Sequence, residues 1–196
     1  MRIAVVGGGI FGVTAAIKLA KKHNVDLFEK NNDILSSASG INQYRLHRGY
    51  HYPRSSETTI SLLKTESLFK QEYKSAIINN IDHYYCISKK DSLTSVDEYL
   101  DFCKEHKLEY KIADLDIINH KNVDLCIKGK ESLIDPIKLK RICWNKLNKT
   151  DINVLLNTTA TKEIFTKYDK VILATYARQN YLLKIFPKRQ TAMAMV

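Results

Sequence analysis

Runs of consecutive apolar residues, separated by stretches with helical spacing, define the beginning and the end of the chain. Ile3–Val6 and Val171–Ala174 are continuous apolar runs, and Val25–Phe28 is apolar except for Asp26. Strands of a parallel sheet that is covered on both faces have this composition. Residues 10–22 carry apolar side chains at helical spacing and end in basic residues, which predicts a helix. These elements predict an α/β fold in which a parallel sheet is flanked by helices.

The pattern changes in the middle of the chain. Residues 81–88 are rich in aromatic and β-favouring side chains and predict a strand, and shorter strand candidates follow at 109–112 and 123–127. A Ser-x-x-Glu capping box at 95–98 opens a helix between them. We therefore predict an insert of antiparallel strands and one helix over residues 76–130.

The pattern of the first part resumes after this insert. Asp135-Pro136 supplies a helix cap and a proline at the first helical position, and the helix is expected to end near residue 148. Strands are predicted at 152–156, 160–165 and 170–175. The predicted domain organisation has three parts: a nucleotide-binding domain, first part, at 1–75; a partial, β-rich insert at 76–130; and the second part of the nucleotide-binding domain at 131–196.

Residues 54–73 also have helical spacing, with Ser55 or Ser56 as the N-cap. One apolar stripe of this helix is expected to face the core. The stripe consists of Ile60, Leu63, Leu68, Phe69 and Tyr73.

The connection at 31–53 has neither a helical nor a strand period, yet it is crowded with aromatic and hydrogen-bonding side chains. Long irregular connections in compact domains tend to be functional. His47 and His51 lie four residues apart within it, but Gly49 and Pro53 disfavour a helix there. Because no third ligand is evident, we do not expect a metal site.

The glycines at the beginning of the chain have the spacing of a dinucleotide-binding turn. They lie between a predicted strand and a predicted helix, and Glu29 ends the next predicted strand. Gly7 permits the tight turn, Gly9 lets backbone N–H groups approach a pyrophosphate, and Gly12 lets the helix lie close to the strand. The phosphates then lie at a helix N-terminus, where unpaired N–H groups favour an anion, and Glu29 accepts hydrogen bonds from ribose hydroxyls.

Composition and charge narrow the class of protein. The chain has 196 residues, 44% hydrophobic and 27% charged, which is typical of a folded globular protein. Its net charge of +10 invites a nucleic-acid partner, but the lysines are scattered through every segment. The densest basic stretches, 138–141 and 188–189, are too short to form a basic arm. We therefore expect no nucleic-acid partner.

Cysteine usage and apolar run lengths bear on the compartment. The four cysteines form no CxxC pair, so free thiols in a reducing compartment are expected. The first apolar run stops at the glycines after four residues, too short for a signal peptide, and no stretch approaches membrane-spanning length. The sequence therefore predicts a cytoplasmic protein with no membrane span.

Nearly the whole chain, in order, resembles the FAD-dependent oxidoreductases of the D-amino-acid oxidase type. In that family FAD lies extended across a Rossmann-like domain, and a β-rich domain covers the flavin and holds an amine or amino acid. The resemblance therefore implies FAD as cofactor, a small-molecule substrate and amine or amino-acid oxidation. The residues that carry it are Gly7–Gly12, Glu29-Lys30, Ser37-Ala38-Ser39-Gly40-x-Asn42, Glu131-x-x-Ile134-Asp135-Pro136 and the strand at 168–175.

The resemblance also implies cofactor-binding roles by position. Glu29 would hold the adenosine ribose with Lys30 beside it, and Ala160 would offer backbone contacts to adenine. Around the pyrophosphate it places Gly7, Gly9, Ile10, Phe11 and Gly12. The resemblance places Ser37, Ser39 and Asn42 along the cofactor toward the flavin. It places Ala174 and Thr175 at the end of the strand beneath the cofactor.

No side chain is identified as catalytic by the resemblance. Five residues of the irregular connection are candidates to lie near the flavin or to bind an anionic substrate, because arginine pairs with carboxylates through two hydrogen bonds. An open alternative is that they pack this connection and hydrogen-bond its backbone. The candidates are Arg45, His47, Arg48, His51 and Tyr52.

Two departures from the family pattern affect these expectations. Tyr176 stands where the family commonly has glycine after Ala-Thr, at a point of close approach to the cofactor. The sequence also ends at Val196, before the remaining substrate-domain strands of the family. This predicts a truncated product, a fragment, or one half of a split enzyme whose complementary polypeptide supplies the rest.

Three alternatives stay open from the sequence. One is a flavoprotein without net redox chemistry, of the sugar-mutase kind, which also uses a glycine turn beside FAD. Another is a nucleotide-binding remnant without catalysis. The third is an NAD(P) enzyme, since both cofactors contain ADP, although residues 36–42 and 168–175 favour FAD.

Overall fold

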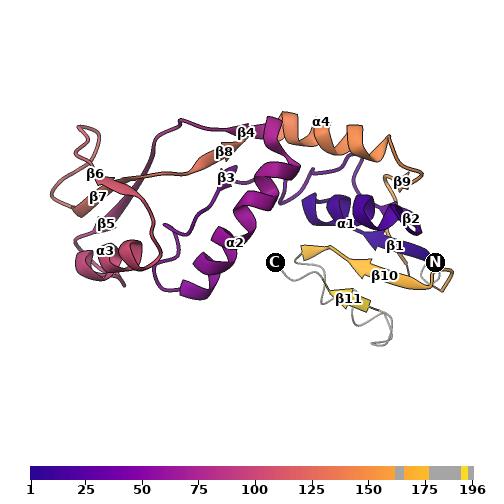
Figure 1. Ribbon diagram of the computed structural model, residues 1–196, viewed down its shortest axis with the longest axis horizontal. Coiled ribbons are helices and arrows are strands. Elements are labelled where there is room, and N and C mark those ends of the chain that lie inside the picture. Colours follow the sequence, from indigo (N-terminus) through magenta and orange to yellow (C-terminus); the bar gives the residue numbers. More distant parts are fainter. Residues whose placement is uncertain (162–165, 177–190, 194–196) are drawn as a thin grey trace. The chain divides into compact units, whose positions relative to one another are not determined.

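Figure 1 shows the computed structural model of the chain, which describes residues 1–161, 166–176 and 191–193. The chain forms two compact units. Unit 1 consists of residues 1–43 and 136–196, and unit 2 of residues 44–135. The predicted insert at 76–130 lies within unit 2, which begins earlier in the chain than the insert. The assignment of these stretches to a nucleotide-binding and a substrate domain stays a prediction.

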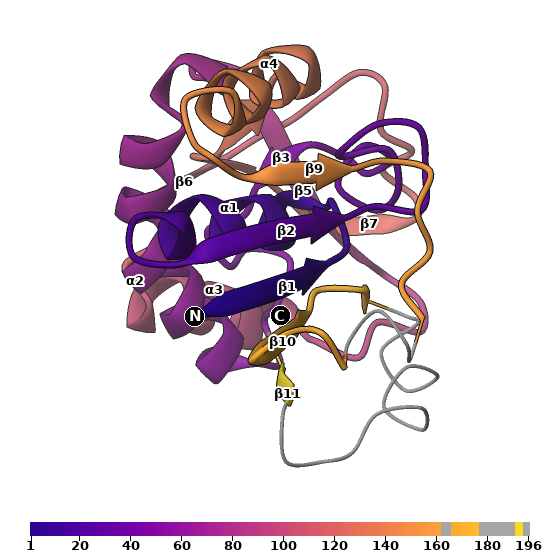
Figure 2. The same cartoon turned by 90° about the vertical axis from the view of Figure 1, so that its right-hand side faces the viewer.

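Unit 1 is built on a five-stranded parallel sheet, and this confirms the expected Rossmann-like α/β class. The strand order is β11-β10-β1-β2-β9, and Figure 2 shows it from β9 at the top to β11 at the bottom. The central strand β1 places Val5 opposite Leu27 on one side and Ile172 on the other. The strands are β1 (Arg2–Val6), β2 (Asn24–Phe28), β9 (Asn153–Leu155), β10 (Lys170–Leu173) and β11 (Thr191–Met193).

Two helices belong to the described part of unit 1. Helix α1 (Ile10–Ala20) packs on β1, β2 and helix α4 (Pro136–Leu147). The loop after β2 is tied to α4, because Asp33 accepts hydrogen bonds from Lys140 Nζ at 2.8 Å and Trp144 Nε1 at 2.9 Å. This anchor joins two segments that lie more than a hundred residues apart in the sequence, and no local pattern predicts it.

The predicted elements of unit 1 are confirmed with small shifts at their ends. The strand expected at 170–175 ends at Leu173. The helix expected at 10–22 ends at Ala20. The run predicted at 160–165 falls largely outside the described residues, since only 160 and 161 are described.

Unit 2 contains two small antiparallel sheets. The larger one has the order β5-β7-β6 and consists of β5 (His83–Ser88), β6 (Tyr110–Ile112) and β7 (Val123–Gly129). The smaller one has the order β3-β8-β4 and consists of β3 (Arg45–Leu46), β4 (Ile77–Ile78) and β8 (Ser132–Ile134). Strands of two or three residues are too short to show an alternation of apolar and polar side chains, so the sequence does not predict the smaller sheet.

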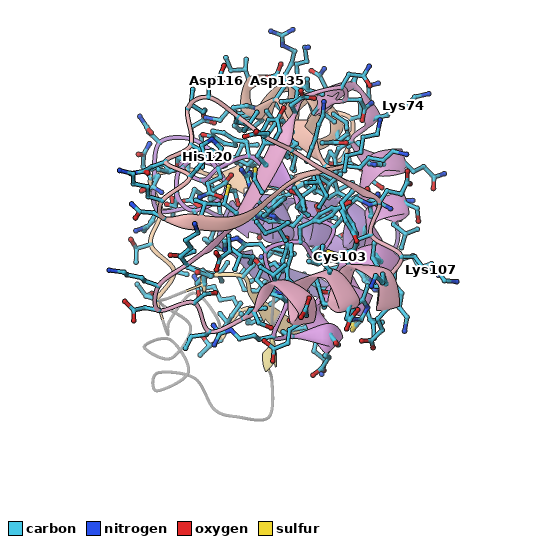
Figure 3. All side chains as sticks on the ribbon, turned by 90° about the vertical axis from the view of Figure 1, so that its left-hand side faces the viewer. Lys74, Cys103, Lys107, Asp116, His120 and Asp135 are labelled. Atoms are coloured by element: carbon cyan, nitrogen blue, oxygen red, sulfur yellow. The ribbon has the colours of Figure 1, made fainter. Side chains whose placement is uncertain are left out.

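The helices of unit 2 are α2 (Ser56–Glu72), the 3-10 turn η1 (Lys74–Ala76) and α3 (Val96–Glu105). The predicted capping box of α3 is confirmed, with Ser95 and Glu98 bonded in both directions. Helix α3 packs its aromatic face into a core with Tyr50, Tyr85 and Ile127, and Figure 3 labels Cys103 on this helix. None of the helices in the described ranges has the length and hydrophobicity that a membrane crossing requires.

The predicted core stripe of the helix at 54–73 is wrong in part. Ile60 and Leu68 are exposed, whereas the fully buried residue of α2 is the polar Thr59. Thr59 is buried because the chain at Gly49 passes so close that a Cβ there would lie 2.3 Å from Thr59 Cγ2. The helix therefore packs through a close backbone approach rather than through the whole apolar stripe.

Candidate functional site

The glycine turn after β1 is held by backbone contacts that exclude any side chain at its first position. Gly7 has φ +107°, and its N–H donates to Phe28 O at 2.8 Å. A Cβ at Gly7 would lie 2.4 Å from Ala174 O, at the end of β10. Gly7 is therefore required both by its backbone conformation and by the neighbouring strand.

Two further glycines shape the beginning of α1. A Cβ at Gly12 would lie 1.8 Å from Gly7 O, so glycine there lets the helix lie against the turn. Gly9 is the N-cap of α1 and has no side chain to cap the helix, and the first turn contains no acidic residue. The nearest contact of a Cβ at Gly9 would be Ser39 Oγ at 3.2 Å. The helix N-terminus thus combines a positive dipole end with an uncrowded approach.

The loop after β2 folds back over this turn. Leu35 N donates to Gly8 O at 2.8 Å, and Ile10 N donates to Ser39 Oγ at 3.0 Å. Gly40 fits closely here, since a Cβ would lie 1.9 Å from Leu35 O. The structure therefore brings Ser39, expected from the sequence, to the first residue of α1.

Glu29, the residue after β2, is a buried carboxylate whose two oxygens accept from backbone N–H groups. Oε2 accepts from Gly8 N at 2.6 Å, and Oε1 accepts from Asn31 N at 2.8 Å. A carboxylate oxygen has room for a second donor, so Glu29 can also accept hydrogen bonds from a ligand hydroxyl. The carboxylate thus lies against the glycine turn, as the sequence predicts.

The remaining sequence-predicted residues of unit 1 lie in less defined surroundings. Lys30 and Phe11 are exposed, and Ala160 is packed in the core beside Phe28. Ser37 Oγ accepts from Asn31 Nδ2 at 3.1 Å, and Asn42 Nδ2 donates to Ala38 O at 2.9 Å. These contacts shape the loop itself.

The end of β10 reaches the glycine turn. Ala174 N donates to Val6 O at 2.8 Å, which continues the pairing with β1 by one residue. The hydroxyl of Thr175 is buried and has no hydrogen-bond partner within the described ranges. Tyr176 has φ +49°, the left-handed conformation that glycine adopts readily, and its side chain is exposed. The backbone at 176 therefore takes a glycine-like conformation, and the tyrosine side chain projects into solvent.

Unit 2 contains a second buried carboxylate, Glu131, in a cluster of side chains. Its Oε1 accepts from Arg48 N at 2.8 Å, its Oε2 accepts from Tyr85 Oη at 2.5 Å, and His47 Nδ1 lies 3.8 Å from Oε2. Burial favours the neutral acid, but His47, Tyr85 and the Arg48 N–H together hold the pKa of Glu131 below its ordinary value. Glu131 is therefore a buried anion beside His47.

His47 is part of an aromatic group in unit 2. Its ring stacks on His51 with a centroid separation of 5.9 Å, and the Tyr52 ring meets both edge-on. Within the described part of the chain, no three side chains of His, Cys, Asp or Glu gather as metal ligands. The structure thus brings together three of the five flavin-side candidates.

The two arginine candidates lie in different surroundings. Arg48 Nε lies 3.1 Å from Glu66 Oε2, and its Nη1 donates to Lys130 O, so its guanidinium is engaged within unit 2. The Arg45 guanidinium lies over the Tyr85 ring at 5.3 Å, which leaves its N–H edge available to a ligand. Arg45 is therefore the better placed of the two for an anion.

Glu131 and Tyr85 are functional candidates that the sequence did not identify. In the sequence, Glu131 belongs only to a motif that begins a helix, and Tyr85 only to a predicted strand. Glu131 lies 46 residues from Tyr85 and 83 residues from Arg48 in the sequence, so no local pattern connects them. A polar side chain on the inward face of an aromatic strand is the one local signal that could have found Tyr85.

Comparisons with known proteins agree with this geometry. The family model described as "FAD dependent oxidoreductase" (DAO) matches residues 2–120. The chain is 30% identical over 179 residues to the FAD-dependent monooxygenase kojA of Aspergillus flavus, covering 85% of this chain and 40% of that protein. It is 31% identical over 137 residues to the FAD-dependent monooxygenase FPY4 of Fusarium mangiferae, covering 67% and 37%. The chain therefore spans about two fifths of these curated relatives.

Two solved structures resemble the model in fold. Glycine oxidase from Geobacillus kaustophilus has a TM-score of 0.73 at 15% identity, covering 94% of this chain and 58% of that one. L-α-glycerophosphate oxidase from Mycoplasma pneumoniae, with FAD bound, has a TM-score of 0.74 at 16% identity, covering 94% and 56%. At these identities the likeness is one of fold.

Proposed function

Because the chain belongs to the FAD-dependent oxidoreductases of the DAO family, we propose that unit 1 binds FAD and that the protein oxidises a small amine or amino acid. The observation that carries the proposal is the buried Glu29 carboxylate beside the glycine turn and the uncapped N-terminus of α1. The chain spans 40% of the kojA relative, so the activity of the whole protein is part of the proposal.

The ADP part of FAD would lie along the turn. The turn from Gly7 to Gly12, including Ile10 and Phe11, would surround the pyrophosphate, which the positive end of α1 favours. The N–H groups of Gly7, Gly8 and Ile10 are bonded within the chain, so the other N–H groups of the turn would be the donors. The Ser39 hydroxyl, already at Ile10 N, would donate to a phosphate oxygen. The buried Thr175 hydroxyl offers a second donor at the same end of the sheet. Glycine at position 9 keeps this approach open.

The adenosine part would be held by Glu29 through its remaining lone pairs. Lys30 would flank it, and the backbone at Ala160 would contact adenine, as the family resemblance implies. Ser37 and Asn42 would lie along the cofactor toward the flavin, and Ala174 would end the strand beneath the cofactor. These roles rest on position in the motif and on the geometry around Glu29.

The substrate would be recognised by residues of unit 2. Bound FAD supplies a hydride acceptor for a C–H bond next to an amine nitrogen. Arg45 would bind a substrate carboxylate, because Arg48 is paired with Glu66. His47, whose Nδ1 lies 3.8 Å from Glu131 Oε2, would hold or release a proton, with His51 and Tyr52 packed around it. A cytoplasmic location and a complementary polypeptide stay predictions.

FAD titration of purified protein and of Glu29→Gln tests the proposal. The substitution keeps one oxygen acceptor for the backbone but removes the charge, so we expect FAD affinity to fall by about 10–100-fold, the effect of losing a charged hydrogen bond. Asp151→Asn is the matched control, since Asp151 is an exposed acid of unit 1 and should leave affinity unchanged.

Two outcomes would contradict the proposal. Wild-type protein that takes up no FAD, with no flavin absorbance after reconstitution, would remove the cofactor assignment. Equal FAD affinity in wild type and in Glu29→Gln would remove the ribose role of Glu29 while leaving FAD binding in place. Circular dichroism of both variants verifies that the folds match.

A further inference from the structure

Two cysteines of unit 2 face each other across an antiparallel strand pair. Cys86 of β5 and Cys126 of β7 are direct partners in the register of the larger sheet. Residues that are direct antiparallel partners have Cα atoms about 4.5–5.5 Å apart. A disulfide spans Cα distances of about 4.4–6.8 Å, so the register alone places this pair within reach.

The side chains of the pair lie on the same face of the sheet as well as in register. Partners in an antiparallel pair project to the same face, which places the Cys86 and Cys126 side chains next to each other. All four cysteines of the chain are free thiols in the structure, and Cys103 and Cys143 are each buried on a helix. The Cys86–Cys126 pair is therefore a reduced dithiol on one face of a three-stranded sheet.

The two thiols differ in access, which assigns them different roles. Cys86 is exposed, so a small oxidant reaches its sulfur directly. Cys126 is buried, and burial together with Cys86 raises the pKa of its thiol to about 11, so it is protonated at neutral pH. An exposed thiol next to a shielded second thiol is the arrangement of an attacking and a resolving cysteine.

We propose that Cys86 and Cys126 form a peroxide-responsive modification site, at which hydrogen peroxide converts the two thiols into a cross-strand disulfide. The Cys86 sulfur attacks peroxide, the O–O bond breaks, and Cys86 sulfenic acid and one water form. The Cys126 sulfur then attacks the sulfenic sulfur, the S–S bond forms, and the hydroxide that leaves takes the Cys126 proton as a second water. Two thiols lose two electrons in total, and one peroxide is reduced to two waters.

This site is independent of the proposed FAD chemistry, because it lies on strands of unit 2 that the proposed cofactor contacts do not use. A disulfide between β5 and β7 would cross-link two neighbouring strands of the larger sheet. Oxidation of this cysteine pair by peroxide would therefore modify unit 2, which carries the proposed substrate residues.

Peptide mapping of peroxide-treated protein tests the proposal. Reduced protein is exposed to hydrogen peroxide, alkylated and digested with trypsin without reductant. The expected product links the peptides 75–89 and 122–128, and dithiothreitol separates them. Cys86→Ser should remove this product, and Cys126→Ala should instead accumulate oxygen adducts on Cys86, because the resolving thiol is absent. Cys103→Ser is the matched control and should keep the linked peptides.

Protein unfolded in urea provides the second control, since pairing there is not guided by the register. We expect the 86–126 link to dominate in folded protein and mixed links with Cys103 and Cys143 to appear in urea. Folded wild-type protein that yields only oxygen adducts or intermolecular dimers, without the linked peptides, would overturn the proposal. Equal link patterns in folded and unfolded protein would overturn it as well.

Discussion

Among the residues that the structure describes, each unit buries one carboxylate, and the two carboxylates accept hydrogen bonds from different kinds of donor. Glu29 of unit 1 is 7% exposed and accepts from the backbone N–H groups of Gly8 and Asn31. Glu131 of unit 2 is 5% exposed and accepts from Tyr85 Oη and from Arg48 N, and His47 Nδ1 lies 3.8 Å from its Oε2. Backbone donors come with the turn itself, whereas side-chain donors must be brought together by the fold. The first kind of site is readable from a motif, and the second is not.

Among the substitutions that test this comparison, the one at Glu131 is expected to change the free energy of unfolding most. Glu131→Ala leaves the Tyr85 hydroxyl and the Arg48 N–H without an acceptor. We expect the free energy of unfolding to fall by about 3–5 kcal/mol, the usual cost of removing one partner from a buried charged group. Urea unfolding followed by circular dichroism measures this. A loss below about 1 kcal/mol would show that water replaces the carboxylate.

Glu29→Ala is expected to have a smaller effect on stability. It removes the acceptor of two backbone N–H groups at the turn, at a cost of about 1–3 kcal/mol. The same urea experiment measures it beside Glu131→Ala. Because Glu29 supports the turn as well as the proposed ribose contact, this variant changes folding and FAD binding together. A stability loss larger than that of Glu131→Ala would reverse the comparison.

The Tyr85 hydroxyl isolates one of the side-chain donors of Glu131. Tyr85→Phe removes a single hydrogen bond and keeps the ring that stacks on Tyr50 at 5.3 Å, so we expect a loss of about 1–1.5 kcal/mol. Tyr84→Phe is the matched control on the same strand, where the hydroxyl bonds the exposed Asp82, and it should change stability by less than about 0.5 kcal/mol. Equal losses of unfolding free energy in the two variants would show that the hydrogen bond from Tyr85 to Glu131 contributes no more than the exposed one from Tyr84 to Asp82.

The smallest expected effect is a pH dependence of the Glu131 contribution. The folded pKa of Glu131 is lowered from 4.5, so its contribution to stability is present above that value and is lost as the pH falls through the folded pKa. The stability difference between wild type and Glu131→Gln should therefore be constant near neutral pH and narrow below pH 4.5. Urea unfolding of both proteins across this range measures it. A difference that widens in acid would mean that Glu131 is neutral in the folded protein.

Much of unit 1 was predictable because its signals are local. Continuous apolar runs identified β1, β2 and β10, and the glycines and Glu29 identified the turn between them. The capping box at Ser95 likewise identified the start of α3. In each case the pattern lies within a short stretch of sequence, so composition and spacing are sufficient to predict the element even where its partners lie elsewhere in the chain.

The rest was not predictable, because the contacts join distant segments. The Asp33 anchor on α4 and the donors of Glu131 depend on residues tens of positions away. The apolar stripe predicted for α2 is wrong in part for a related reason. The chain at Gly49 approaches α2 closely and buries Thr59, whereas Ile60 and Leu68 stay exposed. Helical periodicity states which residues share a face, but it does not state what covers that face.

The interrupted layout of unit 1 has a consequence for the order in which the protein folds. The central strand β1 pairs on one side with β2, which follows it closely, and on the other with β10, which begins at Lys170. The contiguous segment 44–135 leaves the ribosome in one block and completes its own sheets first. Until β10 is synthesised, the apolar edge of β1 is unpaired and exposed to association with other chains. Assembly of unit 1 therefore requires closure of the long loop between β1 and β10, and we expect this closure to be its slow step.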